Sequence, residues 1–209
     1  MRVDHSLAPT GRWYTGSGIY RHVWLDVVDS VHVPEDGIFA RTGIVDFSLN
    51  QAELLVDTEV NSLETATELT LIHRLRDTQG KVVASISRRF NTTKDVTKVF
   101  EDKLNISAVK LWSTDTPYLY QLETQIWHGD KQIDNKQTRV GIRTIDYNAK
   151  QGFLLNNQAI ELEGMSLHHD AGPVGAAVPD DVWRRRLQQL KDMGMNALRP
   201  AHTIFPNIL

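Results

Sequence analysis

Residues 160–199 read IELEGMSLHHDAGPVGAAVPDDVWRRRLQQLKDMGMNALR, and their order of elements decides the fold of this part. Residues 160–167 predict a strand, and residues 196–199 predict a second one. Between them, Val178-Pro179-Asp180-Asp181 predicts a helix start, because proline fits a first turn and aspartates suit the positive end of a helix. Strand, loop, helix and strand in this order predict a βα unit of a parallel sheet. Gly194 is placed to end the helix in a left-handed cap. The apolar residues of the helix recur at helical spacing and are Val182, Trp183, Leu187, Leu190 and Met193.

The chain before this unit consists of short alternating or β-branched segments. Turn residues separate them at Pro34–Gly37, Asp77–Gly80 and Gly129-Asp130. About seven strands fit between residues 29 and 146, which is typical of an immunoglobulin-like β-sandwich. A small hairpin is predicted at Gly152–Ile160. The other strands are predicted at 19–27, 53–60, 68–75, 82–90, 97–106 and 118–127.

The change from alternating strands to a βα unit predicts a domain boundary near residue 146. The region from residue 147 onward has about 60 residues, whereas a closed eight-stranded barrel needs roughly 250. We therefore expect this domain to be cut short. There is no internal repeat and no low-complexity tract.

Composition excludes several classes of protein. The 209 residues include 23 basic and 26 acidic side chains, for a net charge of −3, and no basic stripe that would follow a phosphate backbone, so nucleic acid is not an expected partner. No run of about 18 apolar residues predicts a membrane span, and Met1–Gly11 lacks the order of a secretion signal. With no cysteine, disulfides and thiolate metal sites are excluded, while a cytoplasmic, periplasmic or secreted location stays open.

Histidines follow both predicted strands of the βα unit. His168 and His169 come directly after the first strand, and His202 follows the second. In a βα barrel the carboxyl ends of the strands form the active face, where an imidazole can hydrogen-bond a sugar hydroxyl or stabilise developing charge. Alternatively, the three are polar loop residues without a ligand. A metal site at His168, His169 and Asp170 is less favoured, because adjacent side chains seldom converge on one ion.

Aromatic clusters elsewhere allow two interpretations. Arg12-Trp13-Tyr14 could stack on a sugar ring, but packing against a neighbouring domain is favoured. Trp112 and Asp115–Tyr118 are expected to form a corner of the sandwich and not a binding cleft.

Glycoside hydrolysis usually needs two carboxylates, about 5 Å apart when configuration is retained. The sequence nominates no such pair. Asp180 and Asp181 are explained as residues that open the helix, and Glu161 and Glu163 alternate within the predicted strand. Asp170 is the remaining acid near the expected rim. No serine-nucleophile, phosphate-loop or dinucleotide motif is present.

The combined segments resemble glycoside hydrolase family 2, which contains β-galactosidases, β-glucuronidases and β-mannosidases. The Leu-His-His-Asp form at 167–170 is typical of the β-galactosidase branch. The last residues, Thr203–Leu209, depart from the family pattern. The segments that carry the resemblance are Arg12–Arg21, Leu111–Tyr120, Val140–Ile145, Leu154–Asp170 and Met193–Arg199 with His202.

The resemblance implies three parts. Residues 1–28 would end a jelly-roll sugar-binding domain, 29–146 would form the immunoglobulin-like sandwich, and 147–209 would start a (β/α)8 barrel. The fold class is therefore mainly β. The chain would be an internal fragment of a retaining enzyme of the β-galactosidase type.

The resemblance also implies roles for three residues. His168 and His202 would contact the sugar in the first subsite, and Arg12 would approach the same pocket. The family's acid/base and nucleophile are glutamates on later strands, which would lie beyond Leu209. No residue here is therefore expected to be catalytic, and the fragment itself is expected to be inactive. No cofactor and no metal are expected.

The expected partner is a β-linked oligosaccharide or galactoside, and a homo-oligomer is left open. The choice among galactoside, glucuronide and mannoside is also open. The alternative hypothesis is a non-catalytic sandwich that acts in carbohydrate binding or subunit contact.

Overall fold

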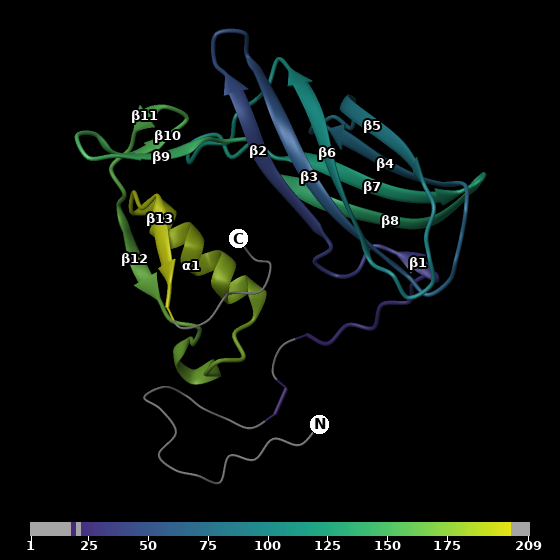
Figure 1. Ribbon diagram of the computed structural model, residues 1–209. Coiled ribbons are helices and arrows are strands. Elements are labelled where there is room, and N and C mark those ends of the chain that lie inside the picture. Colours follow the sequence, from purple (N-terminus) through teal and green to yellow (C-terminus); the bar gives the residue numbers. More distant parts are fainter. Residues whose placement is uncertain (1–17, 20–21, 202–209) are drawn as a thin grey trace. The chain divides into compact units, whose positions relative to one another are not determined.

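The computed structural model describes residues 18–19 and 22–201 (Figure 1). Contacts divide the chain into two compact units. One runs from Asp26 to Ile160, and the other contains Glu161 onward together with the residues up to Leu25. Strands dominate the described residues, as the mainly β fold class predicted.

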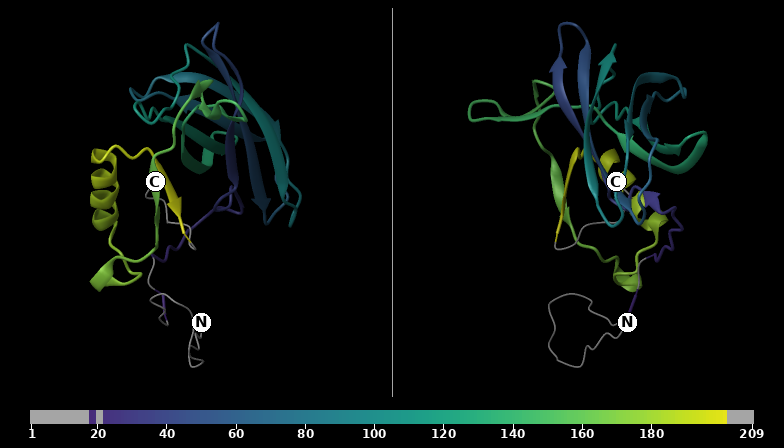
Figure 2. Two further views of the ribbon diagram at one scale, coloured as in Figure 1. Left: turned by 90° about the vertical axis from the view of Figure 1, so that its left-hand side faces the viewer. Right: turned by 45° about the vertical axis from the view of Figure 1, so that its right-hand side comes forward.

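The unit Asp26–Ile160 contains two four-stranded sheets that lie face to face (Figures 1 and 2). In the first sheet β3 is the centre, because β1, β2 and β6 all pair with it. The second sheet has the order β5-β4-β7-β8. Strands of the first sheet are β1 (Val31–His32), β2 (Ile38–Asp46), β3 (Gln51–Ser62) and β6 (Lys98–Ser107), and those of the second are β4 (Leu69–Arg76), β5 (Val82–Phe90), β7 (Tyr120–His128) and β8 (Lys131–Val140).

The chain passes between the sheets three times, at β3–β4, β5–β6 and β6–β7. As a result β4 pairs on one side with its hairpin partner β5 and on the other with the distant strand β7. All these pairs are antiparallel. Two antiparallel sheets with such crossings form a sandwich of the immunoglobulin-like kind, as the strand pattern predicted.

Period-two alternation builds the core of the sandwich, since every second residue of a strand faces the opposite sheet. The inward residues form two apolar clusters. One contains Ala52, Leu54, Val56, Leu75, Leu104, Ile106, Val109, Tyr120, Leu122, Val140 and Ile142, and the other Val31, Val33, Val60, Ala66, Leu69, Leu71, Phe90 and Ile126.

A polar layer interrupts the apolar core. Thr58, His73, Asp102 and Thr124 occupy inward positions of β3, β4, β6 and β7, and all four are buried. Each stands where the alternation of its strand would otherwise supply an apolar side chain. The sandwich therefore contains a layer that must be satisfied by polar contacts.

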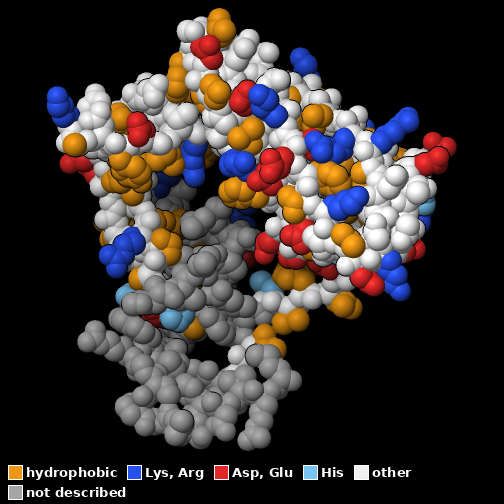
Figure 3. Space-filling view, viewed as in Figure 1, with side chains coloured by type: hydrophobic (Ala, Val, Ile, Leu, Met, Phe, Trp, Pro, Cys, Tyr) orange, Lys and Arg blue, Asp and Glu red, His pale blue; other side chains and the backbone are white. Residues whose placement is uncertain are grey.

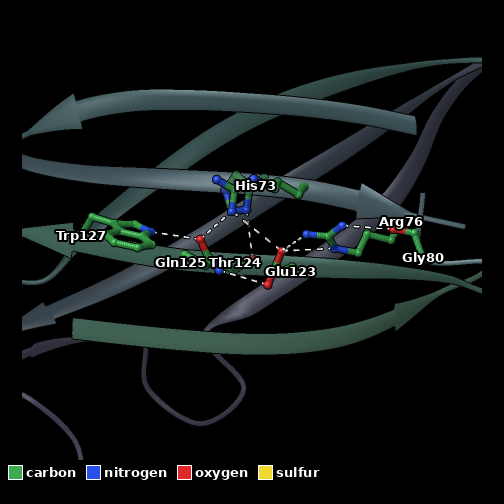
Figure 4. Close-up of polar contacts among 8 residues, drawn as sticks. His73, Arg76, Gly80, Glu123, Thr124, Gln125 and Trp127 are labelled. Atoms are coloured by element: carbon green, nitrogen blue, oxygen red, sulfur yellow. Dashed lines mark hydrogen bonds and ion pairs between the residues drawn. The ribbon is translucent and has the colours of Figure 1, made fainter. Parts of the chain in front are cut away.

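The outer surface of the sandwich carries charges of both signs, which are interspersed on the face that Figure 3 shows. A second set of polar contacts lies on the outward faces of β4 and β7 (Figure 4). Glu123 Oε2 lies 3.1 Å from Arg76 and 3.8 Å from Arg74. Gln125 Oε1 accepts hydrogen bonds from Arg74 at 2.6 Å and from Trp127 Nε1 at 2.9 Å. The contacts of Arg74 and Arg76 with β7 join the two central strands of the second sheet on the side away from the core.

The predicted turns are confirmed. Gly37 N donates to Pro34 O, and Gly80 N donates to Asp77 O, both at 3.0 Å. The hairpin predicted at Gly152–Ile160 is also present, as β10 (Gly152–Leu155) and β11 (Gln158–Ala159), and β10 also pairs with β9 (Ile145–Asn148). Asn156 and Asn157 have positive φ values, 52° and 63°, which a two-residue hairpin turn of this kind requires.

The strand predicted at 19–27 is not observed in the described part of that segment. Residues 22–28 are irregular and exposed, with exposed fractions of 81% for Trp24 and 92% for Val27. An alternating pattern forms a strand only when a neighbouring strand accepts its backbone hydrogen bonds. None of the described sheets includes this segment.

The other unit contains a parallel βαβ arrangement, as predicted. β12 (Gly164–Leu167) pairs with β13 (Ala197–Pro200), and α1 (Asp180–Asp192) lies between them in sequence and alongside them in space (Figure 2). A short 3-10 helix, Gly172–Val174, follows β12. No helix in the described part of the chain is long and apolar enough to cross a membrane.

The predicted apolar face of α1 is only partly buried. Trp183 is buried, and Val182, Leu187 and Leu190 are partly exposed. Met193, however, is 69% exposed, because the helix has already ended at Asp192.

Gly194 ends α1 in the left-handed conformation, with φ of 91°. Its amide donates to Lys191 O at 2.9 Å, and the Met195 amide donates to Leu190 O at 3.1 Å. Gly194→Ala is expected to cost about 1 kcal/mol, because a Cβ disfavours positive φ while nothing within 4 Å would obstruct it. Faster hydrogen exchange of the Met195 amide would report this loss. Met193→Ala is the control, and equal exchange in both variants would contradict the expectation.

Candidate functional site

His168 and His169 directly follow β12, at the carboxyl end of the strand. Both are partly buried, and Nδ1 of His169 is buried without a hydrogen-bond partner among the described residues. The other two predicted sugar-contacting residues, Arg12 and His202, lie outside the described residues, as do Trp13 and Tyr14. Their roles stay predictions.

The position of the catalytic glutamates is also untested. The described residues end at Ala201, so the segment from His202 to Leu209 lies outside them. The resemblance to the family implies that the acid/base and the nucleophile would lie beyond Leu209, on later strands. That expectation stays a prediction, as does the absence of a catalytic residue from the chain itself.

The pairing of β12 with β13 fixes where the histidine segment, His168–Asp170, leaves the sheet. Leu167 is opposite Pro200, and the amide of Ala201 donates to Leu167 O at 2.8 Å. Because the strands are parallel, their carboxyl ends lie at the same edge. The histidine segment therefore begins at the edge where β13 also ends. In a βα barrel this is the active edge.

The side chain of Asn196 replaces strand pairing just before β12, which begins later than predicted. Its Oδ1 accepts from the Glu163 amide, and its Nδ2 donates to Glu161 O, both at 2.9 Å. The Asn196 amide also donates to Glu163 O at 2.9 Å. These bonds satisfy the carbonyl of Glu161 and both the amide and the carbonyl of Glu163, and β12 starts after them, at Gly164 and not at residue 160.

Gly164 allows the close approach of β12 and β13. A Cβ added there would lie 2.2 Å from Ala197 O and 2.7 Å from the Ala197 carbonyl carbon. These are backbone atoms and cannot rotate away, so the position accepts only glycine unless a strand moves. The sequence places Gly164 within the strand but gives no sign of which atoms it approaches.

Glu163 and His168 lie at opposite ends of β12. Glu163 precedes the strand and His168 follows it, so about five residues at roughly 3.3 Å each separate them. Glu163 therefore does not share the edge at which the histidines lie. Asp180 and Asp181 lie exposed in the first turn of α1, as predicted.

Metal-ligating side chains are not gathered in the described regions. No group of three or more histidine, cysteine, aspartate or glutamate residues there could hold a metal ion.

Trp112 contacts residues at the end of the sandwich. The guanidinium carbon of Arg143 lies 4.6 Å from the Trp112 ring centroid, and the Trp112 amide donates to Ile142 O at 2.8 Å. Asn156 Nδ2 donates to Trp112 O, and Asn156 Oδ1 accepts from the Thr144 amide, both at 3.0 Å. The β10–β11 turn is thereby bonded to the end of the sandwich.

No motif in the sequence points to the polar layer in the sandwich core. Arg88 of the edge strand β5 donates to Asp102 Oδ1 from Nε at 2.9 Å and from Nη2 at 2.5 Å. Asp102 Oδ2 lies 3.4 Å from His73 Nε2, an ion-pair contact that lacks good hydrogen-bond geometry. His73 also contacts Thr58 Oγ1 at 3.3 Å and Thr124 Oγ1 at 3.0 Å.

The neighbours of Asp102 determine its pKa. Burial by itself would raise the pKa of Asp102, but the contacts with His73 and Arg88 outweigh it and hold the pKa below its ordinary value. The pair of Arg88 and Asp102 is therefore an ionic contact between the two sheets.

Residues 31–143, more than half of the chain, match the protein family described as Glycosyl hydrolases family 2. The matched residues coincide with the sandwich. The chain belongs to this family, as the resemblance implied.

Similar proteins cover almost the whole chain. The β-galactosidase BoGH2A of Bacteroides ovatus is 39% identical over 203 residues, which are 97% of this chain and 24% of that protein. A putative β-glucuronidase of Formosa agariphila is 35% identical over 99% of this chain and 19% of its own length. The crystal structure of a glycosyl hydrolase family 2 member from Bacteroides cellulosilyticus superposes with a TM-score of 0.88 at 34% identity, covering 95% of this chain and 25% of that one. The chain thus spans about a quarter of the length of these relatives or less.

Proposed function

We propose that this chain is part of a retaining β-glycosidase of the β-galactosidase type, which hydrolyses terminal β-linked sugars. In this proposal His168 and His202 contact the sugar, Arg12 approaches it, and further barrel strands beyond Leu209 supply the catalytic carboxylates. The domain limits proposed are 1–28, 29–146 and 147–209. The 209-residue chain alone is expected to lack activity.

One observation carries the proposal: the histidine segment follows a strand of a parallel βαβ unit, and this unit follows a sandwich matched by the family. The exposed β12 supports the view that the unit is only part of a barrel. Gly164, Met165 and Ser166 are exposed, whereas strands of parallel sheets are normally buried on both faces. Relatives named as β-galactosidase and β-glucuronidase support the substrate class.

The proposal predicts no hydrolysis by the isolated chain. The purified chain is incubated with chromogenic β-galactoside and β-glucuronide, and release of the chromophore is compared with a preparation from an empty vector. We expect equal rates, because bond cleavage needs a pair of carboxylates at the scissile bond. Hydrolysis above the control would contradict the expected inactivity of the chain. Hydrolysis that His168→Ala does not reduce would also contradict the assignment of His168.

A titration separates the proposal from the alternative of a carbohydrate-binding sandwich. Galactose and lactose are added to the chain while binding heat is recorded. A pocket that lacks most of its barrel is expected to give no saturable binding. Saturable binding that survives His168→Ala would instead favour a binding site on the sandwich and would overturn the proposal for this chain.

A further inference from the structure

The backbone of the histidine segment is fixed at both ends. At its start, Leu167 O accepts from the Ala201 amide at 2.8 Å. After its end, the Ala171 amide donates to Gly175 O at 3.0 Å, and Ala171 is buried. Between these points lie His168, His169 and Asp170. A side chain that holds a backbone atom of this segment would determine how the imidazoles are presented.

Arg186 of α1 provides this contact. Its Nη1 donates to the backbone O of Asp170 at 2.9 Å. The guanidinium carbon also lies 5.3 Å from the ring centroid of Trp183, one turn earlier on the same helix. Trp183 is 5% exposed, so the ring against which Arg186 lies is itself fixed by burial. Arg186 is partly buried, whereas its neighbours Arg184 and Arg185 are exposed.

Arginine suits these two contacts for a physical reason. A planar guanidinium can lie over an aromatic ring and donate a hydrogen bond in its own plane at the same time. A lysine ammonium could reach the carbonyl but would not be oriented in this way by the ring. Trp183 therefore orients Arg186, and Arg186 holds the carbonyl at the end of the histidine segment.

We propose that Arg186 is a positioning residue, which fixes the backbone at Asp170 and thereby the orientation of His168 and His169. The proposal rests on the proposed function only for its consequence, namely that these imidazoles face a sugar. The placement itself concerns this chain alone. It can be tested without sugar and without activity.

The test uses ¹⁵N-labelled histidine in the full 209-residue chain and records the imidazole resonances. His168→Gln and His169→Gln assign the two signals by their loss. Arg186→Ala is expected to shift and broaden both signals, because the segment loses its contact with α1. Arg186→Lys is expected to restore them in part. Arg184→Ala and Arg185→Ala, on the exposed side of the same helix, are the controls and should leave both signals in place.

Unchanged His168 and His169 signals in Arg186→Ala would overturn the proposal, as would equal shifts in the Arg185→Ala control. If Arg186→Ala loses the helix, Arg186→Gln decides, because it keeps a donor and a similar length without the charge. In Arg186→Gln, the His168 and His169 signals should be shifted and broadened relative to the unsubstituted chain, but less than in a chain whose histidine segment is disordered. If Arg186→Gln and Arg186→Lys both give signals identical to those of the unsubstituted chain, this result would contradict the role of the guanidinium. Saturable binding in the sugar titration would contradict the proposed function but would not change these imidazole signals. The two proposals can therefore fail separately.

Discussion

Asp102→Ala is expected to lower the free energy of unfolding of the sandwich by about 3 kcal/mol at neutral pH. Removing one partner of a buried ion pair typically costs about 3–5 kcal/mol, because the other charge is left uncompensated. The lower end applies here, since the side chain of Arg88 is 38% exposed and can reach water, whereas those of His73 and Asp102 are 1% exposed. Urea denaturation followed by far-ultraviolet circular dichroism measures the loss.

Two further variants separate charge from volume and position. Asp102→Asn keeps the shape of the side chain, so a loss close to that of Asp102→Ala would assign the effect to the carboxylate charge. Asp57→Asn removes a carboxylate that pairs with Arg41 between β3 and β2, where both side chains are more exposed. An exposed pair contributes less than about 1 kcal/mol. Equal losses for Asp102→Asn and Asp57→Asn would contradict the role of the polar layer.

The same layer predicts the direction of the pH dependence. The pKa of Asp102 is lowered in the fold relative to the ordinary value of 3.8. A carboxyl with a lowered pKa stabilises the fold fully above its unfolded pKa, and this contribution disappears as pH falls through the folded pKa. The difference in stability between the unsubstituted chain and Asp102→Asn should therefore shrink when the pH is lowered below about 4. A difference that grows in acid would contradict the assignment.

Much of the sandwich could be predicted because its physical signal is local. Alternation identifies β4 and β5 closely, since one face of each strand is apolar and their turn, Asp77–Gly80, is built from residues that favour reversal. The same rule of alternation places His73 on the inward face of its strand with Leu71, and Asp102 on the inward face of its strand with Leu104. What could not be predicted is that these two polar residues meet across the sheets, because that depends on tertiary register.

The candidate site shows the same limit. The order of strand, helix and strand predicts that His168 follows the carboxyl end of β12, and this position is confirmed. The contacts around it depend on distant groups: Asn196 replaces the first part of the strand, and Arg186 reaches a carbonyl 16 residues earlier. Hydrophobic periodicity carries no information about such bonds between polar side chains and backbone. The strand predicted at 19–27 failed for a related reason, since alternation does not say whether a partner strand is present.

Gly164→Ala is expected to have the largest effect in the βαβ unit. The new Cβ would lie 2.2 Å from Ala197 O, so β12 and β13 must separate. Overpacking usually costs about 1–3 kcal/mol, and the upper end, about 3 kcal/mol, applies because the obstruction is backbone. Hydrogen exchange of the Ala201 amide, which donates to Leu167 O, should accelerate by more than about 100-fold.

Gly194→Ala provides the matched comparison, because the two glycines are required for different reasons. Gly194 has a positive φ and open space around it, whereas Gly164 lacks a positive φ and has a crowded neighbour. The first substitution should affect only the end of α1. The second should release the strand pair and, with it, the start of the histidine segment, so the imidazole signals of His168 and His169 should also shift. Gly164→Ala could instead leave both the exchange rate of the Ala201 amide and these imidazole signals unchanged. In that case β13 tolerates the added methyl group, and the close approach of the two strands does not position His168.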